Sequence, residues 1–158
     1  MPSADYHIEK RNRFRDAAAF LATSNRVFSY DPSVQDCFYS AVHEAERFLA
    51  QLGRHSRGHG QRENYITNYM VQARGSIRSR AEFSRNPQHP SDRLFDRRSE
   101  FYYMELTKLR LDLVYGREIL GPLRHASRRD RSRANHILTQ FLTVLAGHER
   151  ILRRRGMI

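Results

Sequence analysis

The residues best suited to chemistry are concentrated in one short segment of the chain, residues 54–62. Three arginines and two histidines stand there among nine residues. In order, the segment is Arg54-His55-Ser56-Arg57-Gly58-His59-Gly60-Gln61-Arg62. Charged side chains are rarely buried without a partner, so a hydrophobic core does not account for this density. We therefore expect the segment to bind or attack an anionic group.

Arg54 and His59, separated by four residues, are the pair whose chemistry is most specific. A neutral imidazole can take the proton from a ribose 2′-hydroxyl, whose oxygen then attacks the adjacent phosphate while a guanidinium stabilises the developing charge. His59 is the predicted base or acid and Arg54 the predicted phosphate clamp. We expect His55, Arg57 and Arg62 to position the backbone, with one histidine returning a proton to the leaving oxygen.

A fixed spacing between an arginine and a histidine is weak evidence by itself, because short patterns recur by chance in an arginine-rich chain. Arg131 and His136 repeat the same spacing. They fall at the start of a predicted long helix without a glycine-bounded loop. We expect this second pair to lie on a solvated helix face.

A metal site in the same segment is not expected. His55 and His59 could share one helix face, being four residues apart. Gly53, Gly58 and Gly60 argue against a helix there, and the sequence shows no evident third ligand. We predict neither a metal nor another cofactor.

The charge of the chain indicates a polyanionic partner. Lys and Arg number 28 against 17 Asp and Glu, which gives a formal net charge of +11 over 158 residues. Only Lys10 and Lys108 are lysines, and arginine suits phosphate because its planar fork binds two oxygens at once. RNA or another nucleic acid is the first expected partner and an acidic membrane surface the second, while a compositional bias of the genome is the alternative explanation.

Cysteine usage and hydropathy indicate the compartment. Cys37 is the single cysteine, so neither an intramolecular disulfide nor a cysteine-based zinc site can form. The first residues carry charges where a signal peptide needs an apolar run, and no stretch approaches the roughly 20 apolar residues of a membrane span. We expect a cytoplasmic protein with no membrane partner.

One amphipathic helix is expected to present the segment. Asp31-Pro32 resembles a helix start, with an Asp cap and Pro in the first position, and Gly53 resembles a helix end. Between them, a 4-3-4-3-4 spacing keeps apolar residues on one face. These residues are Val34, Phe38, Ala41, Ala45, Phe48 and Leu52.

The rest of the chain also shows helical periodicity and no sustained alternation of period two. We predict a single all-α domain over residues 1–158, a bundle of four or five helices. Further helices are expected at about 6–28, 62–73, from Ser91-Asp92 to Gly121-Pro122 with Phe95 one heptad before Tyr102, and 128–154. The aromatic residues Phe101, Tyr102, Tyr103 and Tyr115 suggest a dimer interface.

Residues 75–91 contain few apolar side chains and are predicted to form a mobile loop. Arg74, Arg78 and Arg80 lie at or near its beginning. If RNA is bound, this loop is the most natural flap to contact the phosphates, and affinity should then fall steeply with salt.

Residues 36–62 resemble the HEPN superfamily of helical domains, which occur in nucleotidyltransferase-associated proteins and in ribonucleases of prokaryotes. Phe38-Tyr39-Ser40-Ala41-Val42-His43-Glu44-Ala45 is similar to the conserved helix of these proteins, and Leu49 and Gly53 follow it. Arg54-His55 with His59 then fits their form of Arg, a polar residue and a later His. Residues 102–115 are more loosely similar to the helix that follows.

The resemblance implies a homodimer in which two Arg/His loops face one cleft and cut RNA without metal, as in toxin and defence ribonucleases. It also implies an antitoxin or a nucleotidyltransferase as a candidate partner. Gln61 stands where the variants silenced by AMP transfer carry a Tyr two residues after the motif His, which argues against that modification here. Some such domains are inactive, so the alternative is a non-catalytic basic protein that binds or packages nucleic acid or serves as an assembly partner.

Overall fold

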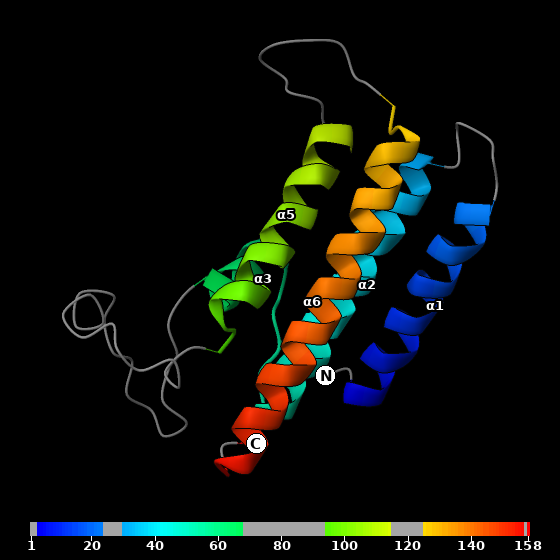
Figure 1. Cartoon of the computed structure of the whole chain (residues 1–158). Helices are drawn as coiled ribbons and strands as arrows, with labels where there is room; N and C mark the ends of the chain where they lie inside the picture. Colours follow the sequence, from blue (N-terminus) through cyan, green and yellow to red (C-terminus); the bar gives the residue numbers. More distant parts are fainter. Residues whose placement is uncertain (1–2, 24–29, 68–93, 115–124, 157) are drawn as a thin grey trace.

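The computed structural model describes residues 3–23, 30–67, 94–114, 125–156 and 158. All regular secondary structure in these ranges is helical, which confirms the predicted all-α class (Figure 1). The five helices are α1 (Ala4–Thr23), α2 (Tyr30–Gln51), α3 (His59–Thr67), α5 (Arg97–Val114) and α6 (Arg128–Arg154). None of them is long and apolar enough to cross a membrane. Residues 75–91 and Gly121-Pro122, about which predictions were made, lie outside the described ranges.

The four long helices run alternately up and down, with the first turns of α1 and α5 at the same end as the last turns of α2 and α6 (Figure 1). Helix α2 packs against α1, α5 and α6 and is thus the central element. This arrangement brings the end of α2, and the segment that follows it, close to the beginning of α1.

The core forms on the predicted face of α2. Val34, Phe38, Ala41, Ala45 and Phe48 are each at most 1% exposed, and Leu52 is partly buried against them. The 4-3-4-3-4 pattern is therefore confirmed, because residues at this spacing fall on one side of a helix. Residues of α5 and α6 complete the same hydrophobic cluster, among them Tyr103, Leu106, Phe141 and Leu145.

Gly53 ends α2 as the sequence predicted. Its φ of +67° lies in the left-handed region, which glycine adopts without steric cost. The Gly53 N–H donates to the Ala50 carbonyl at 3.0 Å, and the Arg54 N–H donates to the Leu49 carbonyl at 2.9 Å. These two bonds are the Schellman pattern, which satisfies the last carbonyls of a helix and turns the chain sharply. Residues 54–58 leave α2 from this turn.

Three helix boundaries differ from the predictions. Helix α2 begins at Tyr30, so Asp31 lies in its first turn, where its carboxylate accepts a hydrogen bond from the Ala126 N–H. Helix α3 begins at His59 and not at Arg62. Helix α5 begins only at Arg97, after Asp96 accepts bonds from two N–H groups of the first turn. Phe95 therefore precedes the helix to which it was assigned, and the predicted start at Ser91-Asp92 lies outside the described residues.

The boundaries of α6 are confirmed at 128–154. Ser127 caps the helix: its hydroxyl accepts from the Asp130 N–H, and the Asp130 carboxylate accepts from the Ser127 N–H at 2.9 Å. This reciprocal capping box satisfies two N–H groups that a helix end leaves unpaired. Arg153 and Arg154 in the last turn complement the helix dipole, as expected.

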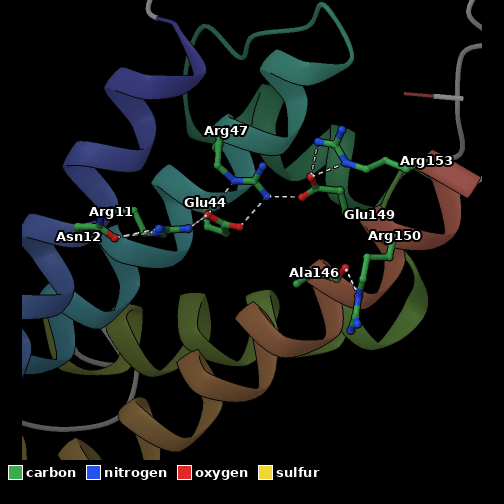
Figure 2. Close-up of polar contacts among 8 residues, drawn as sticks. All are labelled: Arg11, Asn12, Glu44, Arg47, Ala146, Glu149, Arg150 and Arg153. Carbon is green, nitrogen blue, oxygen red and sulfur yellow. Dashed lines mark hydrogen bonds and ion pairs between the residues drawn. The ribbon is translucent and has the colours of Figure 1, made fainter.

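A row of buried ion pairs joins α1, α2 and α6 (Figure 2). Glu44 of α2 accepts from Arg11 of α1 at 2.7 Å and from Arg47 at 2.8 Å. Arg47 also contacts Glu149 of α6 at 2.5 Å, and Glu149 in turn contacts Arg153 at 2.8 Å. Glu44 and Arg47 are three positions apart on α2, the spacing at which charged side chains on a helix can meet.

Of the aromatic residues assigned to a dimer interface, Tyr103 is fully buried within the chain. Tyr102 is partly buried, and Phe101 is 57% exposed. Tyr115 lies outside the described residues. Of these assigned residues, Phe101 on α5 keeps exposed aromatic surface that a second copy could cover.

Candidate functional site

Glu46 anchors the Arg/His segment to the central helix. This α2 residue is 4% exposed, and its Oε1 accepts hydrogen bonds from Arg62 Nε at 2.7 Å and from the Ser56 hydroxyl. Its Oε2 accepts from the Ser56 N–H at 3.3 Å. Burial alone would raise the pKa of Glu46, but the bonds from Ser56 and Arg62 outweigh it and hold the pKa below its ordinary value. The ionised carboxylate therefore folds residues 54–62 back onto α2.

His59 and Arg62 form an Arg/His pair in direct contact. Because α3 begins at His59, the two residues are three positions apart on one helix and share a face. Arg62 Nη1 lies 3.1 Å from His59 Nδ1. A guanidinium can only donate, so Nδ1 is the acceptor and the proton of the neutral ring is on Nε2. Arg62 is buried at 8% exposure, whereas His59 is exposed.

The surroundings of His59 favour its neutral form. Partial burial, followed by the charges of Arg62 and Arg110, lowers the pKa of His59 below its ordinary value of 6.5, and Glu63 opposes the shift. Arg110 reaches this position from α5, where its guanidinium lies 4.8 Å from the centre of the Phe38 ring. An imidazole that is neutral at pH 7 can accept a proton.

The other residues predicted for the site lie in different surroundings. Arg54 is half-buried, with its guanidinium 5.9 Å from the centre of the Tyr65 ring. Arg57 is exposed, and its N–H donates to Gln61 Oε1 at 2.6 Å. His55 is half-buried and points toward α1. Arg74, Arg78 and Arg80 lie outside the described residues.

A group of three histidines adjoins Glu46 on the side of α1. The ring centres of His7 and His55 are 5.9 Å apart, and His7 Nδ1 lies 3.2 Å from His43 Nδ1. Partial burial, then the nearby His7, Arg62 and Lys10, lower the pKa of His43 to about 4. His43 is thus a half-buried histidine that is hydrogen-bonded within the fold. Sequence reasoning missed His7, because its position beside the segment depends on how α1 packs against α2.

Two other reactive side chains near α2 are held un-ionised. Burial raises the pKa of Tyr103 to about 12, although the neighbouring Arg62 opposes the shift. Burial also raises the pKa of Cys37 to about 12, and its thiol donates to Asn135 Oδ1 at 3.3 Å. Since the thiolate is the reactive form, Cys37 is a packing residue and not a nucleophile.

The second pair with Arg-to-His spacing is divided between core and surface. Arg131 is buried, and its guanidinium lies 4.9 Å from the centre of the Tyr30 ring. His136 is exposed on α6. The expectation of a solvated face is thus wrong for Arg131 and confirmed for His136.

Comparisons with protein-family models, with curated proteins and with solved structures give no match. The similarity of residues 36–62 to HEPN domains therefore stays a prediction from those residues.

Proposed function

We propose that this protein is a metal-independent endoribonuclease of HEPN type, acting as a homodimer. The observation that supports this most is the contact of 3.1 Å between Arg62 Nη1 and His59 Nδ1. It joins an exposed imidazole, whose lowered pKa keeps it neutral at pH 7, to a guanidinium on the next turn. The net charge of +11 adds a general attraction for the phosphate backbone.

The proposed reaction begins with the exchange of one donor for another at His59 Nδ1. The ribose 2′-hydroxyl replaces Arg62 Nη1 as the donor to this nitrogen, and the freed guanidinium N–H donates to a phosphate oxygen bound beside it. Nδ1 then takes the hydroxyl proton while the 2′-oxygen attacks phosphorus. The bond to the 5′-oxygen breaks, and water protonates this leaving oxygen. The products are a 2′,3′-cyclic phosphate and a 5′-hydroxyl end.

The other arginines of the segment suit binding better than chemistry. Arg57 is exposed and Arg54 is half-buried, so both can reach an RNA strand that passes His59. Glu46 holds Arg62 in place through its Nε at 2.7 Å and leaves Nη1 to face His59. A fixed guanidinium costs little reorganisation when charge develops on the phosphate.

The direct test is incubation of the purified protein with end-labelled RNA in EDTA. We expect cleavage in EDTA and products that carry 2′,3′-cyclic phosphate ends, identified by their resistance to a phosphatase that removes terminal monophosphates. Cleavage that requires an added divalent ion, or products with 3′-hydroxyl ends, would overturn the proposed mechanism.

The second candidate function is non-catalytic binding of nucleic acid, which the excess of arginine favours by itself. In that case the protein binds RNA with an affinity that falls steeply as salt rises, because each phosphate contact releases a counterion. Saturable, salt-sensitive binding with intact RNA after prolonged incubation would select this function over the ribonuclease.

The lowered pKa of His59 predicts the pH dependence of cleavage. A general base must be unprotonated to act. We therefore expect kcat/KM to stay at its plateau as the pH falls to 6.5 and to decline only at lower pH. Arg110→Gln removes a charge that lowers this pKa, and Glu63→Gln removes one that raises it. We expect the pH at which kcat/KM falls to move up in the first variant and down in the second. Shifts in the same direction would exclude His59 as the titrating base.

A further inference from the structure

Three side chains with metal-binding atoms meet where α1, α2 and the Arg/His segment come together. His7 comes from α1, Glu46 from α2 and His55 from the turn after α2. One nitrogen or oxygen atom of each lies within 4.8 Å of the others. Two imidazoles and one carboxylate are a ligand set that binds zinc and ferrous iron in proteins.

His7 is arranged like a metal ligand. It is 6% exposed, and its Nε2 is buried with no hydrogen-bond partner among the described residues. Its Nδ1 lies 3.2 Å from His43 Nδ1, so one of these two nitrogens donates to the other. If His7 donates, the lone pair is on Nε2. Histidines that bind metals commonly donate their second ring N–H to such a partner, which fixes the tautomer.

One carboxylate oxygen of Glu46 can also accept a further partner. Arg62 Nε and the Ser56 hydroxyl both donate to Oε1, while Oε2 accepts only the 3.3 Å bond from the Ser56 N–H among the described residues. A carboxylate oxygen has two lone pairs, so Oε2 can accept another partner. Arg62 on the other oxygen keeps the carboxylate ionised, as a metal ligand must be.

We propose that His7, Glu46 and His55 bind one divalent transition-metal ion, with zinc as the representative, and with water as a fourth ligand. The ion ties the start of α1 to the end of α2 and to the turn that carries Arg54. Its role is structural, since neither His59 nor Arg62 is among its ligands.

The geometry sets the expected strength of binding. Zinc bonds of 2.0–2.1 Å to tetrahedral ligands place the ligand atoms about 3.3 Å apart, so the separations of up to 4.8 Å must contract on binding. His55 can supply this movement because it lies on a half-buried turn outside the helices. The positive charge of Arg62 opposes the ion, so we expect weaker binding than at a closed four-ligand site.

The test is calorimetric titration of the full chain with Zn²⁺ after removal of metals by a chelator. We expect saturation at one ion per chain and a Tm that rises with Zn²⁺ concentration, since an ion that binds only the folded state stabilises it. His55→Gln should weaken binding by more than the roughly 10- to 100-fold that follows loss of an outer-shell partner, and His7→Gln should do the same.

The matched control is His59→Gln, which replaces the other histidine of the segment and should leave the affinity for Zn²⁺ unchanged. Circular dichroism without metal identifies any variant that fails to fold, and His55→Gln is the safer variant because the residue is not fully buried. Two results would overturn the proposal: no saturable binding to the metal-free chain, or binding that survives both His7→Gln and His55→Gln. Neither readout uses RNA cleavage, so the metal site and the ribonuclease can fail independently.

Discussion

Replacing His59 by alanine is expected to lower the rate of RNA cleavage by about 10²- to 10⁴-fold, the usual contribution of a positioned general base. The side chain is exposed, so its removal should leave the fold intact. RNA binding should change little, because the charges of Arg54, Arg57 and Arg62 remain. The measurement is kcat/KM on labelled RNA in EDTA, with binding followed separately by fluorescence anisotropy.

His136→Ala is the matched control. His136 is also exposed and also follows an arginine by five positions, but it lies on α6 in the second copy of the spacing. We expect full activity from this variant. Equal losses in the two variants would show that the effect does not depend on the position of His59, and cleavage that persists in His59→Ala would remove His59 from the mechanism.

Replacing Glu44 by alanine is expected to lower the free energy of unfolding by about 3 kcal/mol, the lower end of the range for breaking a buried ion pair. Glu44 is 4% exposed and accepts from Arg11 Nη1 at 2.7 Å and from Arg47 at 2.8 and 3.0 Å. Its loss leaves Arg11 without this carboxylate, while Arg47 keeps the contact of 2.5 Å with Glu149. Because this contact remains, we expect a loss at the lower end of the energy range for breaking a buried ion pair.

The matched control is Glu9→Ala, which breaks a pair of the same kind at the surface. Glu9 lies 2.7 Å from Arg13, and both side chains are more than 60% exposed. Exposed pairs contribute at most about 1 kcal/mol, so the change should be small. Urea denaturation measures both variants, with the midpoint expected to fall in Glu44→Ala at an unchanged m value. Equal midpoints in the two variants would mean that burial does not control the energy of these pairs.

Local sequence patterns were sufficient to predict features that depend on one helix alone. The face of α2, the left-handed Gly53 and the full extent of α6 were all predictable. Periodicity and end residues act within a few positions of the chain, so they do not depend on packing. The start of α3 was missed because Gly58 and Gly60 weakened the helix prediction. Gly58 precedes the helix and Gly60 lies in its first turn, in a helix fixed by Arg62 and Glu46.

The amino-acid sequence by itself determined that this protein is helical, basic and equipped with an Arg/His segment placed directly after its central helix. Only the tertiary structure decided which of those residues meet. It placed Arg62 in contact with the His59 imidazole, and it brought His7 from α1 to His55 and Glu46. The physical reason is that these contacts depend on the packing of helices that are distant in the sequence. They also depend on the buried carboxylate of Glu46, which must be hydrogen-bonded. Neither requirement produces a local sequence pattern.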